Sequence, residues 1–295
     1  PIKKSLIVSE SIIIPYGYQV EVGSGSEIDL INGSYILSHS PVKLIGSSKA
    51  PVLIKTTDGT GAGLHVIGAQ KRSYFKFVNV KNQNSPKQKH WALTGAISFY
   101  ESPVTIESCK IEGNKSEDAI NIFRSPFIMS KTVFENTFSD AFDVDFSNGK
   151  ISDCKFIKCG NDGVDVSCSS VKVKRCTFEQ ILDKALSAGE VSNVKIDSIR
   201  VEKVSLAVTS KDLSNIKISN SKIVDCEVGF LAFQKKPEYG ASNISSYNVD
   251  IERFKEFSLI EVGSSLSVNG KSIITRTDNV RKYLYGNEYG KRTVK

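Results

Sequence analysis

The sequence predicts an all-β protein that forms a single right-handed parallel β-helix, a solenoid with coils of about 22 residues. Three observations support this prediction: an internal repeat, short alternating runs, and the lack of helical periodicity. Four similar segments begin 22 residues apart, at Asp118, Asp140, Asp162 and Lys184. Alternating runs such as Val171-Lys-Val-Lys indicate strands with one buried face. No segment has the i, i+3, i+4, i+7 apolar spacing of an amphipathic helix.

Other positions repeat in the same register, which predicts ladders of stacked side chains. One column contains Cys109, Thr132, Cys154 and Cys176, and continues with Ser198 and Ser221. A second column, two residues further along, contains Ile111, Phe134, Phe156 and Phe178. One coil cannot bury its inner face alone, so equivalent strands of successive coils pair at a spacing of roughly 4.8 Å. We therefore expect both columns inside the tube, with the cysteines as free thiols.

The N-terminal third contains short strand-like runs between Gly, Ser and Pro, without the strict period. These runs, from about residue 11 to residue 55, look like the opening coils of the same solenoid. The 295 residues would suit two domains of ordinary size, but a solenoid can use nearly all of them. We predict one β-helix over residues 1–276 and a basic C-terminal tail or cap over residues 277–295. The chain starts at Pro1 without Met or a signal-peptide core, so we expect a mature chain or an excised fragment.

Composition excludes several classes of protein. Hydrophobic residues make up 40% and charged residues 24%, which argues against disorder. No apolar run approaches the roughly 20 residues of a membrane-spanning helix. Six cysteines form neither a dense disulfide pattern nor a zinc-binding CxxC pattern. The chain has 39 basic and 32 acidic residues, a balance that suits nucleic acid, an anionic membrane or an acidic glycan as a partner, and equally a solvated lysine-rich surface.

The repeat gives a direction to each side chain. The second and fourth residues after each leading residue are apolar and must point inward, so the third and fifth point outward. The third position holds Asn121, Asp143, Asp165 and Ser187, and the fifth holds Phe123, Asp145, Ser167 and Gly189. Three carboxylates, Asp143, Asp145 and Asp165, therefore converge on one outer face. Their charged neighbours are Arg124 and Glu190 at the two ends, with Lys184 and Lys211 nearby.

Carboxylates this close repel each other, by roughly 4 kcal/mol at 4 Å and an effective dielectric near 20. Such a cluster is tolerated when a cation bridges it, when one member is protonated, or when basic neighbours compensate. One interpretation is a Ca²⁺ site held by Asp143, Asp145 and Asp165. The alternative is a solvated acidic stripe, in which the leading Asp118, Asp140 and Asp162 only cap turns.

The coils around Asp140-Ala-Phe-Asp-Val-Asp and Gly160-Asn-Asp-Gly-Val-Asp-Val-Ser resemble the right-handed β-helix superfamily of pectin lyase-like and NosD-like proteins. The resemblance covers about residues 10 to 270 and implies the fold. Some lyases of this superfamily bind Ca²⁺ on aspartates and use a Lys or Arg base. Asn161-Asp-Gly-Val-Asp is similar to the calcium-binding coil of one such family, but Ser187 stands where that family's catalytic lysine would fall.

The resemblance implies a lyase that cleaves an acidic polysaccharide by calcium-assisted β-elimination. Its catalytic residues would be Asp143, Asp165, Lys184 as the base and Arg124 as a clamp on the substrate carboxylate. Substrate would also contact Asn121, Glu190, Lys211, Lys235 and Tyr239. A glycoside hydrolase could use Asp143 and Asp165 as its carboxylate pair, although the Gly-His-Gly and Arg-Ile-Lys signatures of polygalacturonases do not occur.

The alternative to an enzyme is a non-catalytic module that binds glycan or builds a cell surface. For either class we expect a monomer that is secreted, periplasmic or on the surface of a bacterial cell. We expect no nucleic-acid partner and no membrane span.

Overall fold

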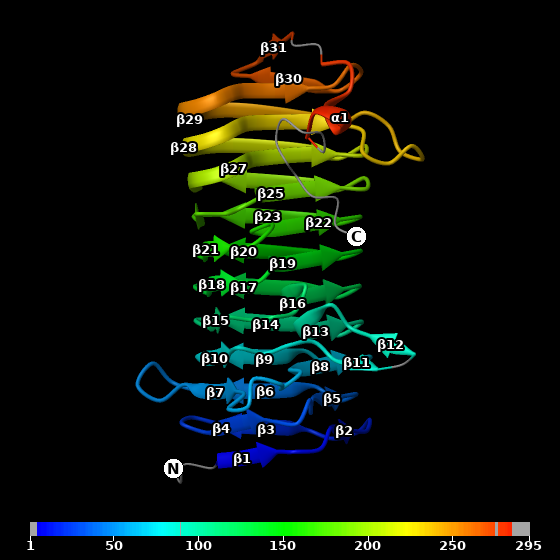
Figure 1. Ribbon diagram of the computed structural model, residues 1–295, viewed down its shortest axis with the longest axis vertical. Helices are drawn as coiled ribbons and strands as arrows, with labels where there is room; N and C mark the ends of the chain where they lie inside the picture. Colours follow the sequence, from blue (N-terminus) through cyan, green and yellow to red (C-terminus); the bar gives the residue numbers. More distant parts are fainter. Residues whose placement is uncertain (1–4, 89, 275–276, 285–295) are drawn as a thin grey trace.

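The computed structural model describes residues 5–88, 90–274 and 277–284. The chain winds into a parallel β-solenoid of about 11 turns, stacked along one axis from the N-terminal to the C-terminal end (Figure 1). Each coil contributes a strand to each of three faces, and each strand pairs in parallel with its equivalents one coil before and one coil after. The predicted right-handed parallel β-helix is therefore confirmed.

Face 1 carries the repeat segments that the sequence singled out. Its separate strands are β2 (Ile12–Ile14), β5 (Ile36–Ser38), β8 (Leu64–Ile67), β13 (Gly95–Tyr100), β16 (Asp118–Phe123), β19 (Asp140–Asp145), β22 (Val164–Ser167) and β25 (Lys184–Gly189). After each of the later strands the chain turns through a non-glycine residue with positive φ, such as Phe146 (φ 50°) and Cys168 (φ 50°). This left-handed conformation is costly, and it places the backbone N–H of Phe146 on the carbonyl of Ser167 in the next coil.

Face 2 follows this corner. Its separate strands are β3 (Val20–Gly23), β6 (Val42–Ile45), β9 (Ser73–Lys76), β14 (Val104–Glu107), β17 (Phe127–Ser130), β20 (Asn148–Ser152), β23 (Ser170–Lys174) and β26 (Asn193–Asp197). A serine column holds the corner between faces 1 and 2. The backbone N–H of Ser125 donates to Oγ of Ser147, and that of Ser147 donates to Oγ of Ser169, at 2.9 and 2.8 Å. Each hydroxyl thus satisfies a buried donor of the preceding coil.

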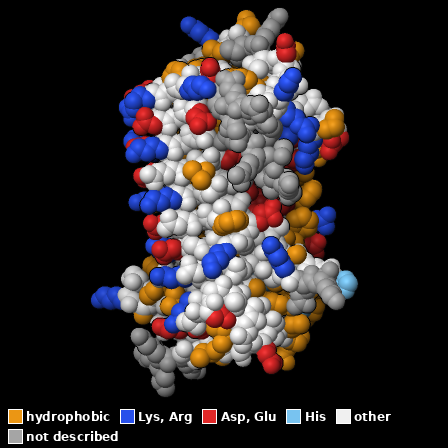
Figure 2. Space-filling model, viewed as in Figure 1, with side chains coloured by type: hydrophobic (Ala, Val, Ile, Leu, Met, Phe, Trp, Pro, Cys, Tyr) orange, Lys and Arg blue, Asp and Glu red, His pale blue; other side chains and the backbone are white. Residues whose placement is uncertain are grey.

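Face 3 completes the coil. Its separate strands are β1 (Ser5–Val8), β4 (Glu27–Leu30), β7 (Val52–Lys55), β10 (Val78–Lys81), β15 (Lys110–Glu112), β18 (Val133–Thr137), β21 (Lys155–Cys159) and β24 (Thr177–Glu179). Basic and acidic side chains alternate along the left edge of the stack in Figure 2, where Figure 1 places the face 3 strands. Pairs such as Lys110 and Glu135, 2.8 Å apart, link neighbouring coils there.

The last coils have longer strands that run through the corners. They are β27 (Arg200–Lys211), β28 (Asn215–Phe233) and β29 (Asn243–Ile260), followed by β30 (Ser265–Val268) on face 2. β31 (Lys271–Ile273) pairs antiparallel with β30 and ends the regular stack. A small antiparallel hairpin, β11 (Lys87–Gln88) and β12 (Trp91–Ala92), lies between β10 and β13 in the chain.

The 22-residue register is confirmed by strand pairing. Phe142 pairs with Val164, and Asp143 with Asp165, in one continuous ladder. Inside the tube, Phe156 stacks between Phe134 and Phe178, with ring centroids 5.1 and 4.8 Å apart and planes 6° apart. The predicted aromatic column is therefore a core ladder.

The cysteine column is also internal, and Cys109, Cys154 and Cys176 are buried free thiols, as predicted. The prediction that Ser198 belongs to this column was wrong. The residue between Cys176 and Ser221 in the ladder is Ile199, because Thr177 pairs with Arg200 and Arg200 with Lys222. Ser198 instead occupies a corner with φ of 59°. An extra residue at the preceding corner shifts the spacing from 22 to 23.

The described part of the C-terminal segment packs against the last coils. The helix α1 (Val280–Leu284) buries Val280 and Leu284 in a small apolar cluster with Leu231 and Phe233. The predicted tail or cap over residues 277–295 is thus partly described, and residues 285–295 lie outside the described part. Among the described residues, no helix has the length and apolar character that a membrane span requires.

Candidate functional site

The alternation on face 1 sorts side chains as the sequence predicted. Phe142 and Val144 belong to the core, and Asp143 between them faces outward with Asp165 on the next strand. This outward row is more enclosed than a solvated stripe would be. Asn121 is 2% exposed, Ser187 is fully buried, and Asp143 is only partly exposed. The row therefore offers polar groups in a desolvated setting.

Asp143 is held by its neighbour in the preceding coil. The side-chain amide of Asn121 donates to Oδ2 of Asp143 at 2.8 Å. Desolvation raises the pKa of Asp143 well above its usual value, and the charges of Asp118, Asp145 and Asp165 raise it further. Asp143 thus favours the neutral, protonated form, which can donate a proton.

Asp165 has the opposite character. Its pKa is lowered: desolvation by itself raises it, but the positive charges of Lys211 and Lys184 together outweigh that burial. Nζ of Lys211 lies 3.8 Å from Oδ1 of Asp165, and the lysine is 4% exposed. The raised pKa of Asp143 and the basic neighbours of Asp165 thus both reduce the repulsion within the carboxylate cluster.

The leading aspartates do more than cap turns, which the sequence did not reveal. Oδ1 of Asp140 accepts hydrogen bonds from the side chain of Asn161 and the backbone N–H of Asp162, both at 2.7 Å. Burial nevertheless raises the pKa of Asp140 to about 6, with Asp165 adding to the shift. Burial raises the pKa values of Asp118 and Asp162 as well. The leading column is thus part of the same titrating cluster.

Lys184 lies in this leading column, inside a buried ion-pair network. Its ammonium is 3.3 Å from Oδ1 of Asp162 and also contacts Asp183. Lys184 is 6% exposed, so its charge is largely removed from water. Its ammonium is therefore held by two carboxylates.

A loop from a later coil brings further predicted residues to the same place. The backbone N–H of Lys235 donates to Oδ1 of Asp212 at 2.6 Å, which fixes the start of the loop. Desolvation lowers the pKa of Lys235, and the positive charges of Lys211 and Lys184 lower it further. In the same loop, Lys236 pairs with the buried Glu190 at 2.7 Å.

Tyr239 closes this end of the site. Its pKa is raised, by desolvation first and then by the nearby Cys168 and Glu190. At the other end, Tyr100 stacks on Phe123 with ring centroids 5.1 Å apart. The pKa of Tyr100 is raised by burial and by the charges of Asp118, Asp145 and Asp143. Tyr100 lies 23 residues before Phe123 and pairs with it in the ladder.

Arg124 lies apart from the carboxylates. It follows β16 at the corner with φ of 47°, and its side chain is exposed. Its guanidinium lies 3.6 Å from Glu101 and over the rings of Phe123 and Phe146. The structure therefore gathers the other predicted residues into one site and leaves Arg124 at its rim.

Two buried polar atoms along this row have no hydrogen-bond partner in the described part of the chain. They are Oδ1 of Asn121 and Oγ1 of Thr209, which share the outward column of face 1. Buried polar groups are nearly always hydrogen-bonded in folded proteins. A row of unsatisfied hydroxyl and amide oxygens beside charged groups is suited to a ligand rich in hydroxyls.

The three carboxylates proposed for Ca²⁺ do not form a ready cage. Across the described residues, no group of three His, Cys, Asp or Glu side chains is arranged to hold a metal ion. Lys211 also brings a positive charge beside Asp165, with Nζ 3.8 Å from Oδ1. The calcium site stays a prediction that a binding measurement must test.

The chain belongs to a known family. The family described as "right handed beta helix region" matches residues 55–196 and 127–279, which together exceed half of the chain. No curated protein matches the sequence.

Solved structures with the same winding have little sequence identity to this chain. A mutant of the periplasmic alginate epimerase AlgG is 10% identical over 91% of this chain and 78% of that one, with a TM-score of 0.55. The catalytic domain of a GH87 alpha-1,3-glucanase in complex with nigerose is 12% identical over 91% of this chain and 68% of that one, with a TM-score of 0.40. Tailspike protein 2 from Escherichia coli O157:H7 bacteriophage CAB120 is 10% identical over 91% of this chain, with a TM-score of 0.49. This chain spans 42% of that tailspike protein.

Proposed function

We propose that the protein is a polysaccharide-active β-helix enzyme that cleaves an acidic glycan by β-elimination, as a secreted, periplasmic or cell-surface protein. One observation carries the proposal: Lys184, Lys211 and Lys235 surround Asp165 beside an aspartate, Asp143, that favours its protonated form. The orphaned oxygens along the same row are suited to sugar hydroxyls. The fold is shared with an alginate epimerase, which makes alginate a natural first substrate to test.

The elimination needs three kinds of group. Cations neutralise the uronate carboxylate and make the adjacent C–H bond more acidic. A base removes that proton, the electron pair forms a carbon–carbon double bond, and the bond to the departing glycosidic oxygen breaks. An acid gives a proton to that oxygen.

The site contains candidates for each role. Lys211 and Lys184 are the cations, because each already pairs with a carboxylate. Lys235 is the base, because its lowered pKa increases the neutral amine at a given pH. Asp143 is the acid. The sequence favoured Lys184 as the base, and its ion pairs with Asp162 and Asp183 are the reason for the reassignment. Arg124 keeps the role of a clamp at the rim, where its guanidinium is exposed.

The test is incubation with alginate and polygalacturonate, followed by the ultraviolet absorbance of the unsaturated uronate product. Asp143→Asn and Lys235→Gln should each lower the rate by about 100-fold or more, the usual contribution of a general acid or base. Asp153→Asn is the matched control, since Asp153 is solvent-accessible and pairs with Arg175 away from the site. Product formed at the wild-type rate by the first two variants would overturn the assignment.

A glycoside hydrolase is the second candidate, and the opposite pKa shifts of Asp143 and Asp165 favour it. Two carboxyl groups with pKa values pushed apart are the arrangement of an acid and a base or nucleophile. Hydrolysis would give new reducing ends without the ultraviolet absorbance. Glycan binding without either product would instead support the non-catalytic module.

A further inference from the structure

Face 2 has a row of four lysines that the candidate site does not use. Lys150, Lys172, Lys195 and Lys217 lie on β20, β23, β26 and β28, and each pairs in register with the next. All four are exposed. Because they occupy successive coils, their ammonium groups form a line parallel to the long axis, spaced by roughly 4.8 Å between strands.

Several other surface lysines pair with an acidic residue of a neighbouring coil. Lys43 faces Glu21 at 3.2 Å, Lys55 faces Glu27 at 2.9 Å, and Lys110 faces Glu135 at 2.8 Å, each across neighbouring coils. In the four-lysine row, each lysine faces another lysine. Within the described part of the chain, none of the four makes an ion pair or side-chain hydrogen bond. Like charges directly opposite each other destabilise a sheet, so the row does not serve stability.

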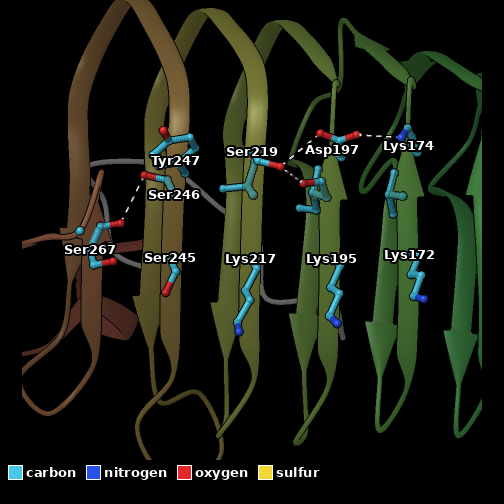
Figure 3. Close-up of a pocket in the computed structure, with 14 residues that line it drawn as sticks. Lys172, Lys174, Lys195, Asp197, Lys217, Ser219, Ser245, Ser246, Tyr247 and Ser267 are labelled. Atoms are coloured by element: carbon cyan, nitrogen blue, oxygen red, sulfur yellow. Dashed lines mark hydrogen bonds and ion pairs between the residues drawn. The ribbon is translucent and has the colours of Figure 1, made fainter.

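Three of the four lysines, Lys172, Lys195 and Lys217, line a groove of about 480 Å³. Figure 3 shows Lys172, Lys195 and Lys217 in line, with Ser245 and Ser267 continuing the line on the next two strands. The neighbouring row holds Lys174 and Asp197, 3.1 Å apart, and then Ser219, whose hydroxyl donates to Asp197 at 3.2 Å.

Tyr247 stands at the end of this neighbouring row with 68% of its surface exposed. On the other side of the lysines, a third row of small polar residues consists of Asn148, Ser170, Asn193, Asn215, Asn243 and Ser265. On this side the lysines are therefore flanked by hydroxyl and amide groups along their whole length, and on the other side by a mixed row that includes Lys174 and Asp197. The groove has one exposed aromatic ring, that of Tyr247.

We propose that face 2 binds a linear carboxylated polysaccharide that lies along the groove, with its carboxylates on Lys150, Lys172, Lys195 and Lys217. A chain with one carboxylate per sugar presents negative charge at regular intervals, which suits a regular line of cations. The flanking Ser and Asn side chains hydrogen-bond the sugar hydroxyls, and Tyr247 packs against a ring. This inference rests on the proposed function only in taking a polysaccharide as the ligand.

The row and the candidate active site occupy the same coils. Asp143, Asp165 and Ser187 of face 1 precede Lys150, Lys172 and Lys195 of face 2 across the serine corner. The two sites are thus on adjacent faces of one rigid stack. A glycan held on face 2 would keep the enzyme on its polymer between cleavage events.

The experiment compares binding of polygalacturonate oligomers by calorimetry at low salt. The triple variant Lys172→Gln, Lys195→Gln and Lys217→Gln should bind at least tenfold more weakly than the wild type. The matched control is the triple variant Lys131→Gln, Lys155→Gln and Lys158→Gln, which removes three exposed lysines elsewhere and the same net charge. It should bind within about twofold of the wild type. Equal losses in both variants would show that only net charge matters and would overturn the proposal.

Two further measurements distinguish glycan binding on face 2 from binding at the candidate active site and from binding of another kind of partner. The double variant Asp143→Asn and Asp165→Asn should lose product formation and keep the face 2 affinity, so failure of the active-site proposal and failure of this one are distinguishable. Competition by single-stranded DNA or by anionic phospholipid vesicles more strongly than by polygalacturonate would assign the row to another partner and overturn the proposal. Replacing the three lysines with arginine should retain binding, which excludes a general effect of mutating face 2.

Discussion

Asp143 and Asp165 lie directly opposite each other on β19 and β22, yet the fold shifts their pKa values in opposite directions. Asp143 is desolvated and faces other carboxylates, whereas Asp165 has Lys211 3.8 Å away. Since one repeat separates the two residues, the difference arises from what the adjacent coils place beside them. The pair therefore has an acid and an ionised carboxylate available at the same pH.

Asp143→Asn should stabilise the protein while it removes activity. The substitution keeps the shape of the side chain and removes a carboxyl group that must stay protonated beside like charges. We expect the free energy of unfolding at neutral pH to rise, since the folded state no longer has to hold a proton on this carboxyl group. Urea denaturation measures this change, with Asp153→Asn as the control. A clear loss of stability in Asp143→Asn would show that the carboxyl group is structural.

Stability should fall as pH rises through the range in which the buried aspartates ionise. The pKa of Asp140 is about 6 in the fold against 3.8 for the unperturbed group, so the folded state holds its proton more tightly. The stability from this group is therefore complete below about pH 4 and is lost as pH rises through about 6. For Asp140 the loss is on the order of 2 to 3 kcal/mol.

Urea denaturation from pH 4 to pH 8 checks this dependence. Asp140→Asn should flatten the profile over this range, because it removes a group that titrates there. Asp225→Asn should leave the profile unchanged at these pH values, because its salt bridge with Arg253 lowers the pKa of Asp225. A wild-type profile that rises from pH 4 to pH 7 would contradict the raised pKa values.

The sequence predicted the fold and the outward direction of the carboxylates because both follow from the repeat. A strict 22-residue period fixes the register, and alternation fixes which side chains leave the tube. The predicted position of Ser198 was wrong, because the corner at Glu190 and Val191 contains an extra residue. Both of these residues adopt positive φ. The sequence also did not reveal how deeply the outward side chains of face 1 are buried, or that Asp140 and Asp162 belong to the same cluster. Burial depends on packing against segments that are distant in sequence, and no repeat encodes it.

Phe156→Ala should cost more stability than any surface change in the stack. Phe156 is fully buried and stacks on Phe134 and Phe178 in adjacent coils. Removing a buried phenylalanine side chain typically costs about 3–5 kcal/mol, because it leaves a cavity that the rigid ladder cannot close. Phe138→Ala is the control, since Phe138 is 70% exposed and should change stability by less than about 0.5 kcal/mol. Similar midpoints of urea denaturation for the two variants would contradict the core ladder.

Calcium binding should depend on Lys211 if Asp143, Asp145 and Asp165 hold the ion. The ammonium of Lys211 lies 3.8 Å from Asp165, so an incoming Ca²⁺ competes with a positive charge that is already in place. Lys211→Gln should therefore bind Ca²⁺ more tightly than the wild type, by about tenfold for each 1.4 kcal/mol of repulsion removed. Calorimetric titration with CaCl₂ measures both affinities, and Asp165→Asn on the Lys211→Gln background should abolish the gain. Lys155→Gln, which removes an exposed lysine on face 3, controls for net charge. The absence of binding heat in wild type and Lys211→Gln alike would remove calcium from this site and leave the lysines as its only cations.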